Sequence, residues 1–354
     1  MLGAFLIAAL AASPPGPDAR IAVLPVENLC GHAIDGRWFE AGLRDALAAR
    51  GLAVVDPAAV EASMARERVR YTGGLEPGCA QALAADTGAT AALITSVERF
   101  TDTAEPALGL TMRLVATSPD LRILWIDGSG TTGVDRPGAL DLGIVRDPDA
   151  LVATALSDLA GRLAASLGGA SRKKEGVPHR FRPRKEYGAT AQALAKPGVR
   201  VVVLPFTNRS DRRRAGEIVA LHFVRRLASR PEVDVVEPGL VRQVLLSTRI
   251  IPEGGIAFAQ ADLLKGILGA DLVVTGEVLD YEDPEGPEPV PVVDFSVQLL
   301  DTSVRRVVWS SYSHNSGIDR VWFFEHGRIR TANVLASQMS MAAVDRMLRA
   351  KGKP

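Results

Sequence analysis

Apolar and polar positions follow the same pattern twice along this chain. Residues 20–28 and 200–208 are each a β-branched apolar run that ends near a proline, which predicts a buried strand followed by a loop. An amphipathic stretch comes next in both places, over residues 37–50 and about 212–229. Gly51 stands where a helix commonly ends at a glycine, so both stretches are predicted to be helices.

The pattern continues with a short strand and two short helices in each half. Val54-Val55-Asp56-Pro57 matches Val235-Val236-Glu237-Pro238, and a proline after an acidic residue suits the first turn of a helix. The predicted helices cover 58–69 and 77–87, then 239–249 and 258–268. Gly-Ala pairs at 88–89 and 269–270 then introduce strands over 91–100 and 272–281.

Each half closes with two strands and a helix. Residues 108–117 and 121–127 flank a turn in the first half, as do 292–300 and 305–311 in the second. The final helices are predicted near 151–163 and 329–349, where apolar residues recur at helical spacing.

Equivalent segments differ by 180 or 181 positions as far as the third strand of each half, which indicates an internal repeat. The predicted fold class is α/β of the mixed α+β kind, with two tandem β-α-β-α-α-β-β-β-α domains, each a mixed sheet covered by helices. The expected divisions are a signal peptide and leader over 1–19, a first domain over 20–167, a basic linker containing Pro and Gly over 168–198 and a second domain over 199–354.

Charge is distributed unevenly along the chain, although its formal sum is zero. The first domain carries 13 basic and 19 acidic residues, the linker 8 and 2, and the second domain 20 and 19. Neither domain is basic enough to grip nucleic acid, so no nucleic-acid partner is expected.

The amino terminus predicts export to the periplasm or cell envelope. Residues 2–12 form an apolar run of signal-peptide length that is too short to span a bilayer, and Ala9-Leu10-Ala11 resembles a cleavage site. No Lys or Arg precedes the run, so a late start codon or a disordered tail stays open. No other segment is expected to cross a membrane, which leaves peripheral membrane contact and no transmembrane pore.

Cys30 and Cys79 are the two cysteines, and both lie in the first domain. In an oxidising compartment they are expected to form a disulfide. The alternative is two ordinary buried thiols, because sequence does not give the distance between them. Cys30, His32 and Cys79 would supply only three metal ligands, whereas structural zinc takes four, so no metal is expected.

The strand that ends in Val-Leu-Pro-x-x-Asn, and the later Asp-Pro or Glu-Pro and Gly-Ala pairs, resemble the CsgG-like group of envelope domains. That group includes LpoB-like domains and the amino-terminal domain of TolB. The resemblance covers both halves and implies a non-catalytic envelope domain used in assembly or partner contact. It carries over to Pro25, Asn28, Pro205 and Asn208 as loop positions after the first strand of each half.

The sequence departs from the pore-forming members of that group. The loop over 101–107 is short, and the loop over 282–291 is acidic and rich in proline. Such segments do not suit a lipid-facing strand.

Each candidate catalytic or cofactor motif lacks a structural feature that its chemistry requires. Residues 128–133 fit the glycine pattern of dinucleotide-binding loops, but the following Pro137 and Gly138 do not continue into the helix that would hold a pyrophosphate. Ser310, Ser311 and His314 are close in sequence to Asp319, which is no evidence for a triad assembled in space. His222 lies in a predicted helix and is expected to be a packed core residue. No cofactor is predicted.

A basic patch occupies the linker. It is expected to be a solvated tether, with docking on the acidic first domain or on an anionic envelope surface as alternatives. Its members are Arg172, Lys173, Lys174, Arg180, Arg182, Arg184 and Lys185.

Trp322, Phe323 and Phe324 form an aromatic cluster that only the second half carries. Three consecutive aromatic residues cannot all face one core, so a partner surface is one interpretation. The other is that they attach the last helix to the sheet.

Together these patterns predict a non-catalytic exported envelope scaffold or adaptor that binds protein or cell-wall partners. The alternative is a periplasmic small-ligand-binding or transport-accessory protein that uses the cleft between the halves. An enzyme of unknown type is the third hypothesis.

Overall fold

The computed structural model describes residues 19–135, 143–170, 176, 179–190, 193, 198–253, 255–286, 288–321 and 327–349. The first half contains β1 (Arg20–Val23), β2 (Glu27–Asn28), α1 (Gly36–Ala48), β3 (Ala53–Val54), α2 (Pro57–Arg66), α3 (Pro77–Thr87), β4 (Ala91–Thr101), β5 (Ala107–Ala116), β6 (Ile123–Thr132) and α4 (Pro148–Leu167).

The second half repeats this order after a short additional segment. Its elements are η2 (His179–Phe181), β7 (Lys185–Gly188), β8 (Val199–Val203), β9 (Thr207–Asn208), α5 (Ala215–Ala228), β10 (Val233–Val235), α6 (Pro238–Thr248), α7 (Phe258–Leu268), β11 (Leu272–Glu282), β12 (Val292–Asp301), β13 (Arg306–Ser316) and α8 (Ala332–Arg349).

Each half forms a mixed sheet, which confirms the predicted fold class. The first sheet has the order β3-β1-β4-β5-β6, and the second has the order β10-β8-β11-β12-β13-β7. The strands β1 and β8 run parallel to both neighbours, while the three long strands of each half are antiparallel. Helices connect the parallel strands, and loops without helices connect the antiparallel ones.

Local signals fix several helix ends as expected. Pro57 and Pro238 open α2 and α6, where the missing N–H of proline costs no helical hydrogen bond. Gly88 and Gly269 end α3 and α7 with φ values of 66° and 69°, a left-handed conformation that glycine adopts without strain. Asp35 caps α1 by accepting a hydrogen bond from the Trp38 N–H.

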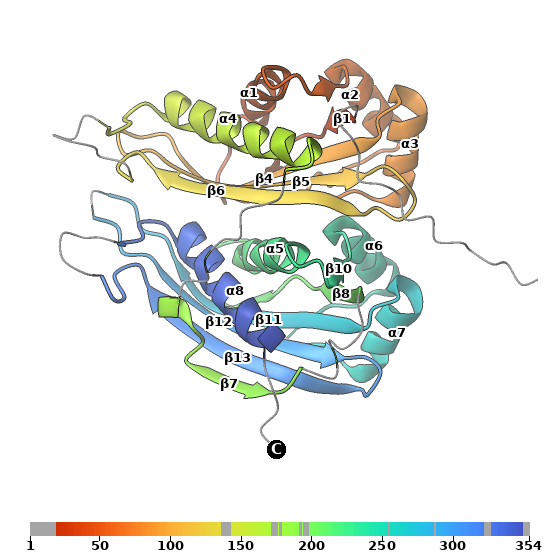
Figure 1. Ribbon diagram of the computed structural model, residues 1–354, viewed down its shortest axis with the longest axis vertical. Coiled ribbons are helices and arrows are strands. Elements are labelled where there is room, and N and C mark those ends of the chain that lie inside the picture. Colours follow the sequence, from red (N-terminus) through yellow and green to blue (C-terminus); the bar gives the residue numbers. More distant parts are fainter. Residues whose placement is uncertain are drawn as a thin grey trace, which may run out of the picture.

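The molecule is built in four layers (Figure 1). The helices α1 and α4 cover one face of the first sheet, and α5 and α8 lie between the first sheet and the second. Within each half, the helix pair α2–α3 or α6–α7 packs under one end of the sheet, where it encloses a smaller core. Helices α5 and α8 of the second half therefore cover the other face of the first sheet.

Part of the predicted linker belongs to the second sheet. β7 pairs antiparallel with β13, and the side chain of Phe181 is fully buried in the core of the second half. The described residues 179–190 are thus packed against the second half instead of forming a free tether. Arg172, Lys173 and Lys174 lie outside the described residues, as do the predicted signal peptide and Trp322, Phe323 and Phe324.

Among the described residues, α4 is long and apolar enough to cross a membrane by length and composition. Its apolar side is buried against the first sheet through residues such as Leu156, Leu159 and Leu163. This one-sided burial is typical of a core helix.

Candidate functional site: the interface between the two halves

The interface between the halves is a continuous buried contact. Leu29 and Ile126 of the first half belong to the same apolar core as Phe223 of α5 and Leu335 of α8. Both α5 and α8 are buried around most of their circumference, because each has a sheet on either side. Burial on this scale gives the two halves one relative orientation.

Glycines in the first sheet make the close approach of α8 possible. A Cβ atom on Gly109 would lie 2.7 Å from Cγ of Asn333, and one on Gly130 would overlap Val334 and Asn333. Residues 128–132 continue strand β6 instead of forming a loop before a helix. The glycine motif of this segment is therefore explained by helix packing between the halves.

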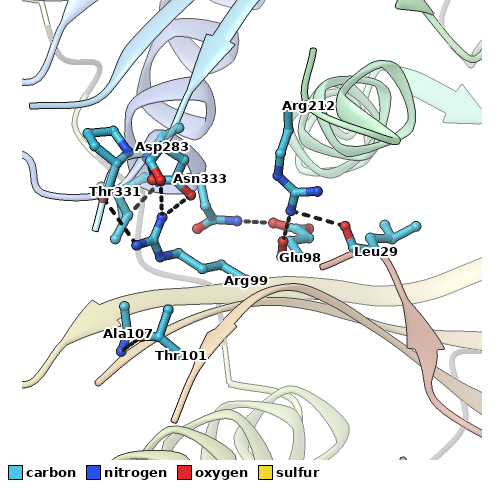
Figure 2. A network of polar contacts seen from close by, with 12 residues as sticks. Leu29, Glu98, Arg99, Thr101, Ala107, Arg212, Asp283, Thr331 and Asn333 are labelled. Carbon is cyan, nitrogen blue, oxygen red and sulfur yellow. Dashed lines mark hydrogen bonds and ion pairs between the residues drawn. The ribbon is translucent and has the colours of Figure 1, made fainter. Parts of the chain in front are cut away.

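Glu98 of β4 lies fully buried at the centre of the interface (Figure 2). Its carboxylate accepts hydrogen bonds from Thr111 Oγ1 at 2.6 Å and from the Asn333 amide of α8. Nε2 of His222 lies 3.6 Å from Oε2 of Glu98. Burial raises the pKa of the Glu98 carboxyl to about 7, since desolvation disfavours its charged form more than the hydrogen bond from Thr111 favours it.

His222 of α5 faces this carboxyl. Its side chain is buried, and burial together with the Arg225 guanidinium lowers the pKa of the imidazole to about 3. The imidazole is therefore neutral near pH 7. The prediction that His222 is buried is confirmed, but it lies against the first sheet and not only within its own half.

Arg212 precedes α5 and binds two backbone carbonyls of the first half beside Glu98 (Figure 2). Its Nη2 donates to the carbonyl of Leu29 at 3.1 Å and to the carbonyl of Glu98 at 2.8 Å. A guanidinium that serves two carbonyls of the other half holds a loop and a strand together.

A second contact closes the end of the interface near α8 (Figure 2). Arg99 of β4 pairs with Asp283, and both side chains are less than one tenth exposed. Asp283 also accepts a hydrogen bond from the Ala332 N–H at 2.8 Å, at the start of α8. The acidic, proline-rich loop after β11 thus caps α8 and binds the first sheet, which is a structural role.

The third contact lies at the opposite end of β5. Arg113 Nε is 3.2 Å from Glu237 Oε1, and neither side chain is exposed. Arg113 also donates to the carbonyl of Gly73, while Glu237 accepts from the Leu240 N–H at 3.1 Å. The same carboxylate therefore caps α6 and joins it to the first half.

Cavities lie within this interface, and two of them adjoin the buried polar side chains of the described residues. One, of about 410 Å³, lies between β6 and the helices α5 and α8, and His222 lines it. The other, of about 330 Å³, lies between the first half and α5–α6, where Arg242 stacks 4.1 Å from the ring centroid of Tyr71. Glu27 borders the second cavity and is held by Ser96 at 2.6 Å and Arg214 at 3.5 Å. Both have the volume of a small-molecule site.

The predicted disulfide is wrong. Cys30 and Cys79 are both free and buried. Cys30 packs in the core under α1 and α4, whereas Cys79 packs in the core under α2 and α3 on the opposite face of the sheet. Burial raises the pKa of the Cys30 thiol to about 12 and that of Cys79 to about 11, so both are poor nucleophiles. The same separation prevents them from sharing a metal with His32.

The loop positions carried over from the family resemblance have a turn role in both halves. Asn28 Oδ1 accepts from the Cys30 N–H at 2.9 Å, and Asn208 Oδ1 accepts from the Ser210 N–H at 3.1 Å. Each asparagine also donates to a carbonyl four residues ahead. Pro25 and Pro205 are half-buried just before them. These residues shape the turns and are not arranged as a catalytic group.

The described part of the basic patch lies along the second half. Arg180, Arg182 and Arg184 line a groove of about 570 Å³ with Arg320. Arg184 Nε donates to the His314 carbonyl at 3.0 Å, and Lys185 begins β7. The groove is cationic, but no described residue of the first half lines it.

The serine and histidine residues near the end of β13 do not form a triad. His314 Nδ1 lies 3.3 Å from Asp294 Oδ2, and the same oxygen accepts from the Tyr312 hydroxyl at 2.7 Å. Asp319 instead accepts from Asn315 at 2.9 Å. Asp294, Tyr312 and His314 lie on the outer face of the second sheet, whereas the buried Asn315 alternates to its inner face.

The sequence interpretation missed the charged centre of the interface. Glu98, Arg99 and Arg113 are charged residues in strands that are otherwise uncharged, and these charges were the available signal. A buried charge needs a partner, so such residues predict a second polar surface packed over the strand.

No protein-family model matches this sequence, and no curated protein matches it. Solved structures do resemble parts of it. The PelC dodecamer from Paraburkholderia phytofirmans is 21% identical, with 48% of this chain and 97% of that chain covered and a TM-score of 0.33. The LpoB C-terminal domain from Salmonella enterica is 19% identical, covering 33% and 84%, with a TM-score of 0.28. The lipoprotein GNA1162 from Neisseria meningitidis is 20% identical, covering 42% and 99%, with a TM-score of 0.30.

Proposed function

We propose that this chain is an exported, non-catalytic scaffold or adaptor of the cell envelope that binds a protein partner through α6 and α7. In this proposal the two halves are copies of one CsgG-like domain. The apolar run over residues 2–12 supports export, and the equivalent strand orders of the two sheets support the relation between the halves.

A group of exposed apolar side chains on α6, α7 and their connection carries the proposal. We call it the α6–α7 surface. Five large apolar residues on α6, on α7 and in the segment between them are 48–70% exposed. They are Leu246, Ile251, Phe258, Leu263 and Ile267.

The first half shows that the fold does not require these side chains. At the equivalent places, 181 positions earlier, it carries small or polar residues. They are Ala65, Arg70, Pro77, Ala82 and Asp86. The helices α2 and α3 match α6 and α7 in length and position, so the apolar residues are an addition of the second half. An addition that packing does not need points to a partner.

Burial of these exposed side chains by a partner would release enough free energy for association. Each large aliphatic or aromatic side chain that passes from water into an interface contributes about 1.5–3 kcal/mol. Exposed apolar groups of this kind mark protein contacts on soluble domains. The buried pairs Arg99–Asp283 and Arg113–Glu237 hold the halves in one orientation, so the surface is presented on a rigid support.

The proposal is tested with the double variant Leu263→Ser/Ile267→Ser. The full-length variant and the native chain are crosslinked in envelope fractions, and the amount of each crosslinked partner is compared. Loss of the apolar anchors is expected to weaken association at least about tenfold, because each tenfold change corresponds to about 1.4 kcal/mol. The melting temperature should hardly change, since both side chains are exposed.

Leu279→Ser/Ile318→Ser is the matched control. These side chains are 40% and 49% exposed, and they lie toward the end of β11 and after β13, away from the strand ends that adjoin α7. An equal loss of partner in both double variants, or no loss in the first, would reject the α6–α7 surface.

A second candidate function is favoured by one observation, the cavity beside His222. It is small-ligand binding between the halves. This function does not depend on the α6–α7 surface, so either proposal can fail alone.

A further inference from the structure

The cavity of about 410 Å³ is built jointly by the two halves. Leu110 of β5 and Gly128 to Gly130 of β6 form its wall on the first half. The second half contributes residues of α5 and α8, which are His222, Arg225, Asn333, Val334, Ser337, Gln338 and Met341. Pockets at the contact between two domains are common places for small ligands.

His222 is the unusual residue of this cavity. Its side chain is only 3% exposed, yet neither ring nitrogen has a hydrogen-bond partner among the described residues. Its nearest charged neighbour is Glu98, at 3.6 Å from Nε2. A buried polar group without a partner is unfavourable, so a group that faces a cavity is expected to serve a ligand.

The protonation state of His222 defines what it can recognise. Burial and the nearby Arg225 lower the pKa of the imidazole to about 3, so the ring is neutral at neutral pH. A neutral imidazole has one donor and one acceptor nitrogen. It therefore suits a ligand group that both donates and accepts, such as a hydroxyl.

The formal charges around the cavity are already paired within the protein. Arg225 Nη2 lies 3.2 Å from Asp127 Oδ1, and Arg225 Nη1 is 3.4 Å from Ser337 Oγ. Glu98 accepts from Thr111 and Asn333. An ionic ligand would have to disturb these pairs, whereas an uncharged ligand would not.

The remaining wall combines polar and apolar groups. Ser337 and Gln338 offer a hydroxyl and an amide, and Leu110, Val334 and Met341 offer apolar contact. Hydroxyl groups around the edge of a ring and C–H groups on its faces are the chemistry of a sugar. A volume of about 410 Å³ accommodates one or two such rings.

We propose that this interdomain cavity binds an uncharged, hydroxyl-rich molecule of monosaccharide or disaccharide size, with His222 as the hydrogen-bonding residue at its base. The proposal gives the second candidate function its ligand class and rests on that function.

The test is a titration of the full-length native chain, followed by NMR with ¹⁵N-labelled histidine. The probes are glucose, N-acetylglucosamine and cellobiose, with glucuronate and glucosamine as charged counterparts. We expect saturable shifts of the His222 ring nitrogens with at least one neutral probe. Binding of its charged counterpart should be at least about tenfold weaker.

His222→Phe should abolish binding of the neutral probe, and His222→Gln should keep part of it because an amide also donates and accepts. Gln338→Leu, which leaves the Glu98–His222 contact intact, provides a second variant if the His222 variants fail to fold, and should weaken binding about tenfold. His314→Gln is the control, because His314 lies on the outer sheet face away from the cavity.

Three results would overturn the proposal. They are no shift of His222 with any neutral probe at millimolar concentration, equal binding of charged and neutral probes, or unchanged binding by folded His222→Phe. The variant Leu263→Ser/Ile267→Ser should bind the neutral probe normally, which separates this site from the α6–α7 surface.

Discussion

Arg113 of the first half and Glu237 of the second form an ion pair in which neither side chain reaches solvent, with 3.2 Å between Nε and Oε1. Burial raises the pKa of the Glu237 carboxyl, while Arg113 opposes that rise. The pair therefore depends on both partners, because each alone would be a buried charge without compensation.

Replacing Arg113 by Met should destabilise the chain by about 3–5 kcal/mol, since Glu237 would stay buried without its cation. Urea unfolding followed by circular dichroism measures the change. Arg305→Met is the matched control, because the Arg305–Asp262 pair is 65% and 36% exposed and should contribute less than about 1 kcal/mol. Similar losses in the two variants would show that the interface pair is not energetically distinct.

In the variant Glu98→Gln, the free energy of unfolding should depend on pH through the titration of His222. The folded pKa of His222 is about 3 against 6.5 for the free group, so the unfolded chain binds more protons in that interval. Stability should therefore rise as pH increases from about 3 to 6.5, by on the order of 5 kcal/mol. A flat profile in urea unfolding over this range would contradict the assigned neutral histidine.

His222→Gln should give the opposite slope. The folded pKa of Glu98 is about 7 against 4.5 for the free group, so the folded chain binds more protons in that interval. Stability should fall as pH rises from about 4.5 to 7, by about 3 kcal/mol. In the native chain the two contributions oppose each other between about 4.5 and 6.5, so the contribution of this pair should be nearly constant there.

Gly130→Ala should destabilise the chain by about 1–3 kcal/mol, because the added methyl group would overlap Val334 and Asn333 across the interface. Gly266→Ala is the control within helix α7, where the added atom meets nothing within 4 Å and the helical backbone should gain up to about 1 kcal/mol. Thermal unfolding compares the two. A stable Gly130→Ala chain would mean that α8 does not need the glycine.

Cys30 and Cys79 should both be recovered as free thiols when the protein is isolated without reductant. They should react slowly with a thiol reagent in the folded protein and rapidly in urea, because burial raises the pKa of both. Mass spectrometry after alkylation counts the modified cysteines. A mass two hydrogens lower, with no thiol modified in urea, would restore the disulfide.

Periodicity and turn residues were sufficient to predict most of the secondary structure. The strand that begins near Ala91 and the helix that begins at Pro238 follow directly from apolar spacing and proline chemistry. Strand β6 extends to Thr132, past the expected end at 127, because Gly128 and Gly130 continue its pairing with β5. Glycine in a strand signals a close neighbour, and the neighbour of Gly130 lies more than 200 residues ahead in the chain.

The contacts of the candidate site could not be predicted in the same way. The sequence placed Cys30 and Cys79 in one half but not on opposite faces of its sheet, which decides whether they can meet. The pairing of Glu98 with Asn333 joins residues 235 positions apart. Such a contact depends on how two finished layers stack, and no local pattern encodes that arrangement.

The layered arrangement gives the molecule a direction. Paired-strand registers place Asp294, Tyr312 and His314 of the second sheet where the first has Gly109, Gly128 and Gly130. These larger side chains would keep a further pair of helices from approaching the second sheet as closely as α5 and α8 approach the first. The outer face of the second sheet therefore does not repeat the close helix contact that the glycines of the first sheet allow. The two ends of the stack of layers are also unlike, with helices at one end and a polar strand surface at the other, so a chain held between two structures would have a head and a tail.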